Sequence, residues 1–291
     1  MMICNLCPRR CGALRTETAG EGFCRMPAQL HIARAGLHHW EEPVISGTRG
    51  SGAVFFSGCT LRCSFCQNSQ ISAGGFGKAI TPQRLRQIFD ELIAQGAHNI
   101  NLVTPDHFTP WILEALDEPL PVPVVWNCSG YASVETLRAL EGKVQIYLPD
   151  LKYADSALAQ KLSCASDYFD KTAAAIEEMY RQVGAAVTGE DGLLQKGVVI
   201  RHLMLPGQLE NTKQCIDWVA RTFPKGEVLF SLMSQYTPQP NAEGQLARKI
   251  RKSEYRAAVE YMALCGIEGG FTQELDSAQA EYTPDFDLTG V

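Results

Sequence analysis

The sequence lacks the long apolar run that a membrane span requires. No stretch reaches the 18 or so consecutive apolar residues of a transmembrane helix, and the start, MMICNLCPRRCG, does not resemble a signal peptide. Positive charge is also scarce, because 26 lysines and arginines face 32 aspartates and glutamates, a net charge of −6. No basic excess is available to neutralise nucleic-acid phosphates. We therefore expect a cytoplasmic protein that binds neither membrane nor nucleic acid.

Cysteine, by contrast, is plentiful. The chain has eleven cysteines, and seven of them lie in two clusters before residue 67. In a cytosolic chain of 291 residues, clustered cysteines indicate metal binding or redox chemistry rather than disulfides. The scattered ones are expected to be small buried apolar side chains. They are Cys128, Cys164, Cys215 and Cys265.

Beyond the N-terminal cysteines, short apolar runs alternate with helical patterns. The clearest helix begins at Thr81, an N-cap residue followed by Pro82, has an apolar face from Leu85 to Ile93 and stops at Gly96. Near-continuous apolar strands alternating with helices are typical of a parallel sheet. The expected strands lie near 53–58, 100–105, 122–130, 144–152, 198–207, 227–236 and 267–272. Further helices are expected near 111–118, 134–141, 167–183, 211–222 and 254–265. Residues 184–197 are expected to form a loop or an excursion.

This pattern predicts an α/β fold with six to seven βα units in an open or closed barrel of the TIM type. The 45% apolar residues suffice for a large core. Residues 1–50 are expected to form an N-terminal four-cysteine segment and linker, and 51–291 the barrel with a C-terminal helix and strand. Chemically active residue types follow the expected strands, at the edge where such barrels place their sites. They are Cys59, Asp106, Asn127, Asp150, Lys152 and Gln235.

Three cysteines crowd into the loop GCTLRCSFCQN (Gly58–Asn68). Cys59, Cys63 and Cys66 are spaced C-x3-C-x2-C, and no fourth cysteine lies nearby. Such a loop can bind three corners of a cubane iron–sulfur cluster and leave one iron open, as a catalytic site requires. The residues alone leave two alternatives, which are a zinc site completed by a distant side chain and free buried cysteines.

The same loop, with aromatic Phe65 before the last cysteine, resembles the signature of the radical S-adenosylmethionine (SAM) superfamily. The resemblance implies a partial (β/α)6 barrel and a 4Fe–4S cluster on Cys59, Cys63 and Cys66, with its fourth iron chelated by the amine and carboxylate of SAM. It also implies reductive cleavage of SAM to a 5'-deoxyadenosyl radical that abstracts hydrogen. An electron donor such as flavodoxin or ferredoxin would then be a partner.

Further segments resemble a narrower group. FFSGCTLRCSFCQN, YLPDLK and VIRHLMLPG are similar to pyruvate formate-lyase activating enzymes, and EEPVISGTRGSG, NLVTPDHF and SGYASVETLRALEG to uncharacterised activating-enzyme-like proteins. This resemblance implies hydrogen abstraction from a glycyl radical protein. The alternatives are radical modification of a small molecule or peptide, and a non-catalytic iron–sulfur electron carrier, against which the barrel-sized chain argues.

The resemblance also suggests which residues contact SAM. The backbone of Phe65 would lie near the adenine, and Lys152, in the Asp-Leu-Lys segment that begins at Asp150, would approach the SAM carboxylate. Arg201 should point toward the barrel mouth or interior and His202 the other way, as a structural residue. The full expected cofactor-binding set is Phe65, Asp106, Asn127, Ser129, Asp150, Lys152, Arg201 and Gln235, and no residue is assigned as catalytic.

The sequence departs from the superfamily in three places. The usual Gly-Gly-Glu that receives the methionyl ammonium is replaced by VTPDHFTP, where Asp106 is the best substitute, ahead of Thr104 and His107. Asn127 stands where an aspartate is expected. GTRGSG (Gly47–Gly52) only echoes the Asp-Gly-Pro-Gly of glycyl radical activators.

The first cysteine cluster has a full set of four thiols. Cys4, Cys7, Cys11 and Cys24 are spaced C-x2-C-x3-C-x12-C, which suits structural zinc or a second iron–sulfur cluster, and the third alternative is that they bind no metal. Binding would help to fold a segment that is too short for a core of its own. The polar run 38–42 is expected either to line a substrate site or to pack beneath the barrel. Tyr131, Tyr153 and Tyr236 are expected as cofactor or substrate contacts or as packing residues.

Overall fold

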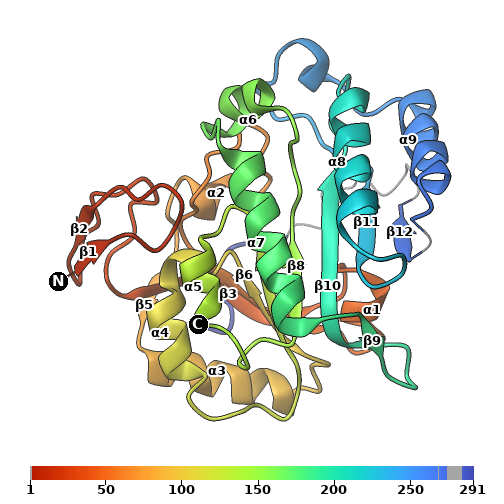
Figure 1. Cartoon of the computed structure of the whole chain (residues 1–291). Coiled ribbons are helices and arrows are strands. Elements are labelled where there is room, and N and C mark those ends of the chain that lie inside the picture. The colour runs from red at the N-terminus through yellow and green to blue at the C-terminus, as the bar shows by residue number, and fades with distance from the viewer. Residues whose placement is uncertain (1, 268, 274–283) are drawn as a thin grey trace.

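The protein is built on a strongly curved sheet (Figure 1), seen here in a computed structural model that describes residues 2–267, 269–273 and 284–291. In this part of the chain, seven neighbouring strands run parallel in the order β4-β6-β7-β8-β10-β11-β12. Antiparallel β3 and β5 extend the sheet beyond β4, and β9 pairs with the start of β10. The α/β fold with a mostly parallel sheet, predicted from the sequence, is confirmed.

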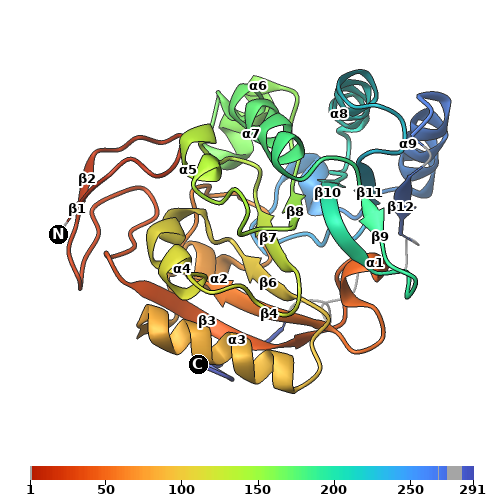
Figure 2. The same cartoon turned by 60° about the horizontal axis from the view of Figure 1, so that its bottom comes forward.

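The strands are β1 (Met2–Cys4), β2 (Ala13–Arg15), β3 (Leu30–His38), β4 (Ser51–Phe56), β5 (Lys78–Ile80), β6 (Ile100–Val103), β7 (Val124–Cys128), β8 (Ile146–Pro149), β9 (Val187–Thr188), β10 (Leu194–Leu203), β11 (Leu229–Met233) and β12 (Gly270–Thr272). The helices are α1 (Pro43–Ser46), α2 (Ser69–Ser72), α3 (Pro82–Ala94), α4 (Thr109–Ala115), α5 (Val134–Arg138), α6 (Ser156–Ser163), α7 (Tyr168–Val183), α8 (Leu209–Thr222) and α9 (Lys252–Leu264), with 3₁₀ turns η1 (Asp106–Phe108) and η2 (Gly244–Ala247). The larger helices cover the outside of the curved sheet (Figure 2).

Helix α3 forms as the sequence predicts. The hydroxyl of Thr81 accepts a hydrogen bond from the backbone N–H of Arg84 at 3.1 Å, and Pro82 occupies the first turn. Gly96, with φ of 95°, follows the end of the helix in a conformation that favours glycine. Strands β3 and β5 and helix α6 were not predicted, because they precede or interrupt the regular alternation on which the prediction was based.

Alternate residues of the strands face the helices and the inside of the barrel. Trp126 and Ile200 belong to the large core under the helices, whereas Val125 and Val199 form a smaller cluster inside the barrel together with Ile45. Ile45 is completely buried and belongs to α1, which lies between β3 and β4 in the chain. The segment before β4 therefore fills part of the barrel interior.

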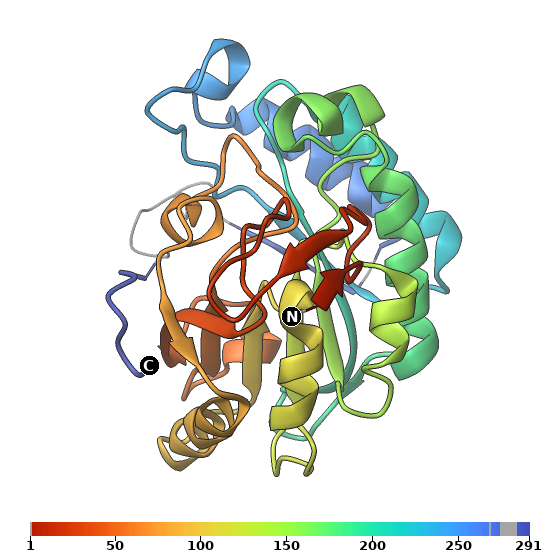
Figure 3. The same ribbon diagram turned by 90° about the vertical axis from the view of Figure 1, so that its left-hand side faces the viewer.

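Two terminal segments attach to this barrel. The β1–β2 hairpin forms a separate two-stranded sheet outside it (Figure 3). At the other end of the chain, residues 284–291 lie along β3, where the N–H of Leu288 donates to Ala33 and the N–H of Ala35 to Thr289. The division of the chain at residue 50 stays a prediction, but β3 belongs to the sheet of the barrel. None of the helices in the described ranges has the length and apolar character needed to cross a bilayer.

Candidate functional site

The three-cysteine loop leaves the carboxyl end of β4. Gly58 starts it with φ of 79°, and a Cβ at this position would lie 2.3 Å from the side chain of Met26. Glycine therefore permits both the turn and the close approach of the N-terminal segment. The preceding carbonyl, of Ser57, contacts His107 Nε2 at 2.7 Å, which joins the start of the loop to η1 after β6.

The thiols of the loop have polar neighbours. Ser163 Oγ donates to Cys63 Sγ at 3.0 Å, and Cys66 Sγ lies 3.2 Å from Ser72 Oγ. Burial raises the pKa of the Cys63 thiol, and the nearby Lys152 ammonium opposes that rise. A thiolate here is stabilised by positive charge, which iron would supply.

The donor set of this loop fits an iron–sulfur cluster. Cys59, Cys63 and Cys66 are free of disulfides. The pKa of Cys59 is raised mainly by burial, and Cys63 and Cys66 raise it further. The three thiols are therefore electrostatic neighbours. Within the described ranges, neither cysteine set is already closed around a point that could hold a metal ion.

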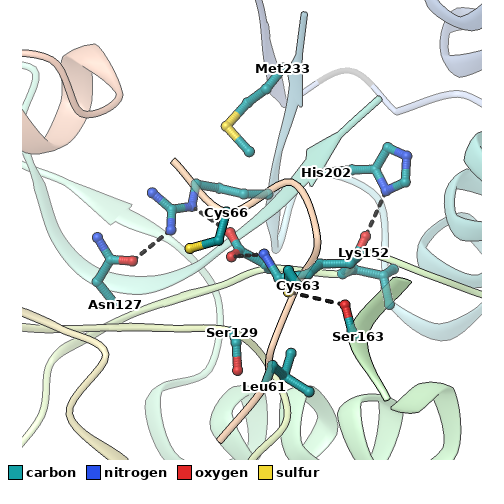
Figure 4. A network of polar contacts seen from close by, with 12 residues as sticks. Leu61, Cys63, Cys66, Asn127, Ser129, Lys152, Ser163, His202 and Met233 are labelled. Atoms are coloured by element: carbon teal, nitrogen blue, oxygen red, sulfur yellow. Dashed lines mark hydrogen bonds and ion pairs between the residues drawn. The ribbon is translucent and has the colours of Figure 1, made fainter. Parts of the chain in front are cut away.

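Arg201 is the centre of a partly buried ionic network. Two of its other members, Asn127 and Lys152, are labelled in Figure 4, where Lys152 lies beside Cys63. Its Nε donates to Asp150 Oδ1 at 3.0 Å, its Nη1 to Glu41 Oε2 at 3.0 Å and its Nη2 to Asn127 Oδ1 at 2.6 Å. Lys152 Nζ donates to the other oxygen of Asp150. A residue of β7 and two residues after β8 are thus joined to β10 and to the segment after β3.

The charges of this network support one another. Burial raises the pKa of Asp150, but Lys152 and Arg201 outweigh it and leave that pKa below its usual value. Burial lowers the pKa of Lys152, while Asp150 and the Cys63 thiol outweigh it and raise that pKa. Both groups therefore stay charged, and the Lys152 ammonium lies beside the cysteine loop.

Glu41 is the member of the network that the sequence did not single out. Its Oε1 accepts from Asn101 at 3.0 Å and from Asn127 at 3.1 Å, in addition to the ion pair with Arg201. The sequence left residues 38–42 open between a substrate site and packing. Only the curvature of the sheet brings this glutamate to strands that lie much later in the chain.

Asp106 lies outside the network. Its Oδ1 accepts from the indole of Trp126 at 3.0 Å, and Trp126 faces the helices, on the opposite side of β7 from Asn127. Burial raises the pKa of Asp106 to about 6, and the Trp126 bond opposes that rise. The partner of its side chain is Trp126 and not Lys152 or Arg201, and its role as the ammonium acceptor remains a prediction.

The other expected cofactor contacts surround the loop. The hydroxyl of Ser129 is buried and has no hydrogen-bond partner. Phe65 packs edge-on against Tyr153 and also borders Tyr236. The carbonyl of Gln235 accepts from Gln67, next to Cys66, at 3.4 Å. These placements leave the cofactor roles of Phe65, Ser129 and Gln235 as predictions.

Three further residues have structural partners. His202 faces the helices and contacts the carbonyl of Leu151 and the hydroxyl of Thr212, as expected of a structural residue. Tyr131 donates to Asp167, and the buried Tyr153 hydroxyl bonds to Ser163.

Of the four scattered cysteines, Cys128 and Cys215 are buried as predicted. Cys265 is only partly buried, and Cys164 is exposed, contrary to prediction, because it ends α6 in a left-handed turn.

The N-terminal thiols also lie together. Burial raises the pKa of Cys7 to about 12, an N–H of Arg9 opposes the rise, and Cys24, Cys4 and Cys11 add to it. Arg9 connects this hairpin to the three-cysteine loop and to α6, because its guanidinium donates to the carbonyls of Thr60, Ser163 and Cys164. The hairpin is therefore held directly against the candidate site.

The fold and the cysteine loop together define a class of protein. Residues 53–219 match the radical SAM superfamily, and the chain belongs to this superfamily. Its members use a 4Fe–4S cluster and SAM for radical chemistry. An uncharacterized protein of Methanocaldococcus jannaschii is 30% identical to this chain. The match covers 88% of this chain and 73% of that protein.

Solved structures show the same fold. Streptococcus suis SuiB bound to its precursor peptide SuiA superposes with a TM-score of 0.52 at 14% identity, over 76% of this chain and 48% of SuiB. SuiB bound to SAM gives a TM-score of 0.52 at 15% identity, over 77% and 50%. This chain thus spans about half the length of SuiB. The resemblance to pyruvate formate-lyase activating enzymes remains a hypothesis.

Proposed function

We propose that the protein binds a 4Fe–4S cluster on Cys59, Cys63 and Cys66 and cleaves SAM there to start hydrogen abstraction. The observation that supports this most is the position of the loop, at the carboxyl end of β4 and beside the buried Lys152. When bound, the reduced cluster supplies the electron that breaks the sulfonium bond, giving methionine and a 5'-deoxyadenosyl radical that takes a hydrogen atom from the substrate. We place this chemistry in the cytoplasm, where thiols stay reduced.

The residues around the loop would orient SAM. The Lys152 ammonium is a suitable partner for the SAM carboxylate, because a buried ligand charge needs an opposite one. Asp150 and Arg201 hold this ammonium in place through their shared ion pair. Further contacts for SAM would come from the Ser129 hydroxyl, the Asn127 amide and the main chain of Gln235. Phe65 would lie near the adenine. Asp106 is the proposed acceptor of the methionyl ammonium.

The target of the radical is a separate question with two candidate answers. The activating-enzyme resemblance favours a glycyl radical protein, with flavodoxin or ferredoxin as electron donor. A cavity of about 200 Å³ beside Arg201, lined in part by charged side chains, favours modification of a small molecule or of a peptide side chain. An electron carrier has no use for such a cavity.

We further propose that Cys4, Cys7, Cys11 and Cys24 bind a second metal centre, either zinc or an auxiliary iron–sulfur cluster. Support comes from the four neighbouring thiols and from Arg15, whose guanidinium lies 3.7 Å from Cys4 Sγ. Four thiolates gathered without a metal would repel one another, and a metal removes that repulsion.

The first experiment reconstitutes the protein anaerobically with iron and sulfide, adds SAM and dithionite, and quantifies 5'-deoxyadenosine. Wild type should form it, whereas Cys59→Ala, Cys63→Ala and Cys66→Ala should fall by at least about a hundredfold, because each removes an iron ligand. Cys265→Ala, at a partly buried thiol on the far side of α8, is the matched control. A cluster-loaded wild type that makes no 5'-deoxyadenosine would contradict the proposal.

A second experiment separates the targets. Incubation with a glycyl radical protein whose glycine does not yet carry the radical should give a glycyl radical signal in electron paramagnetic resonance, if that protein is the substrate. Absence of the signal, while 5'-deoxyadenosine still forms, would favour a small molecule or peptide.

A further inference from the structure

A cavity inside the barrel borders the ionic network. It measures about 200 Å³ and is bordered by Trp40, Glu41 and Glu42 on one side and by Arg201, Ser231 and Gln235 on the other. Gln235 also contacts Gln67, beside Cys66, through its carbonyl. The cavity therefore lies next to the loop that is proposed to hold the cluster.

Two adjacent glutamates at this cavity differ in their partners. Glu41 receives three hydrogen bonds, from Asn101, Asn127 and Arg201. Glu42 is 9% exposed, and its Oε2 atom accepts no hydrogen bond. The Oδ1 atom of Asn101, which adjoins Glu41, also lacks a partner. Of these two acceptor atoms, the Oε2 of Glu42 belongs to a residue that lines the cavity, so a ligand that reaches it must bring a donor.

The charges around the cavity favour a positive donor. The charged residues that line the cavity, within the described part of the chain, are the cation Arg201 and the two carboxylates Glu41 and Glu42. Burial raises the pKa of Glu42, and Arg201 and Ser231 only partly oppose the rise, while the neighbouring Glu41 adds to it. One added cation would balance the set and give the Oε2 atom of Glu42 the hydrogen-bond partner that it lacks.

We propose that this cavity binds a cationic nitrogen of the substrate, a primary ammonium or guanidinium group, with Glu42 as its ion-pair partner. The inference builds on the proposed function, because it makes the bound group part of the molecule from which hydrogen is taken. A primary ammonium has three N–H donors. It is small enough for a cavity of about 200 Å³, because a group of this size, like a water molecule, takes about 30 Å³. The side chains of Met233 and Phe271 also line the cavity and suit an aliphatic chain behind the charge.

The test titrates the reconstituted full-length protein, without reductant, with n-butylammonium, n-butanol and butyrate, and measures binding by calorimetry. We expect n-butylammonium to bind at least about tenfold more tightly than n-butanol and butyrate not to bind, because a charge-assisted bond adds to the apolar contact. Glu42→Gln should reduce the n-butylammonium affinity at least about tenfold. The matched change Glu177→Gln, at an exposed position of α7, should not.

Three results would overturn the proposal. Equal binding of n-butanol and n-butylammonium would mean that water or any polar ligand fills the cavity. Unchanged n-butylammonium affinity in a folded Glu42→Gln variant would exclude this carboxylate. Displacement of n-butylammonium by SAM in wild type would assign the cavity to the ammonium of SAM itself.

The titration requires no SAM cleavage, so its failure is distinct from failure of the proposed function, which is read from 5'-deoxyadenosine. If circular dichroism shows that Glu42→Gln is unfolded, the wild-type comparison of the three butyl compounds and the competition with SAM decide the matter.

Discussion

Arg201 joins three other residues of the candidate site. It is 14% exposed at its side chain and binds Asp150, Glu41 and Asn127, which come from three different parts of the barrel. Removing one member of a buried ion pair leaves the partner charge uncompensated, which costs far more than the loss of a surface pair.

We predict that Arg201→Met lowers the free energy of unfolding by about 3–5 kcal/mol, because Asp150 and Glu41 would stay buried without this cation. Urea unfolding followed by circular dichroism measures the change. The control is Arg256→Met on α9, whose ion pair with Glu260 is exposed, and it should cost less than about 1 kcal/mol. Equal effects of the two changes would show that the network adds little stability.

Glu42 should give stability a distinct pH dependence. Because its pKa is raised in the folded protein, the native state binds the proton more tightly than the unfolded chain does. This group therefore lowers the free energy of unfolding as pH rises above the usual glutamate value of about 4.3, and the cost is full above the folded pKa.

Glu42→Gln is therefore expected to stabilise the protein at pH 8 by about 1–3 kcal/mol, and the gain should shrink as pH falls toward 4. Urea midpoints measured across that range give the answer. Arg201, Glu41 and Ser231 face Glu42 and are unchanged in the variant. A gain that is constant with pH would refute the role of ionisation.

Among the elements, the β1–β2 hairpin contacts the three-cysteine loop directly. Arg9 binds the carbonyl of Thr60 inside that loop and the carbonyl of Ser163, whose hydroxyl donates to Cys63. The hairpin has no sizeable core of its own, so metal binding is the physical means by which it would become ordered.

We predict that Cys7→Ser removes the N-terminal metal. Metal analysis by mass spectrometry should show the loss of one zinc per chain, or a fall from about eight irons to about four, according to which centre is present. Cys265→Ser, the control, should change neither count. If Cys7→Ser and wild type hold the same metals, the N-terminal site does not exist.

Elements that depend on local patterns were predictable from the sequence. The cap at Thr81, the apolar face of α3 and the apolar runs of β6, β7 and β8 act within about ten residues, and all of them were found. The strand β3 was missed because its pairing with β4 is antiparallel and precedes the alternating pattern. Asp106 shows another limit, since its position after β6 was correct while its partner, Trp126, depends on how two strands pack.

At the scale of the whole molecule, the residues before β4 are part of the barrel. β3 pairs with β4 from Ile32 to His38, and Ile45 lies in the inner cluster. We predict that a chain beginning at Leu30 still forms the sheet, whereas a chain beginning at Ser51 does not fold, because it loses that strand and the inner packing. Thermal unfolding by circular dichroism distinguishes the two. A cooperative transition in the shorter chain would restore a boundary near residue 50.

The ion pair between Glu41 and Arg201 joins positions 160 residues apart in the chain. During synthesis at about 5–20 residues per second, the arginine leaves the ribosome roughly 8 to 30 seconds after the glutamate. Until then Glu41 has no cation to accompany it into the barrel, and the inside of the first strands stays open to water. The centre of the site is therefore assembled late, after five of the seven parallel strands have begun to emerge, so iron delivered to the cysteine loop before that time meets an unfinished pocket.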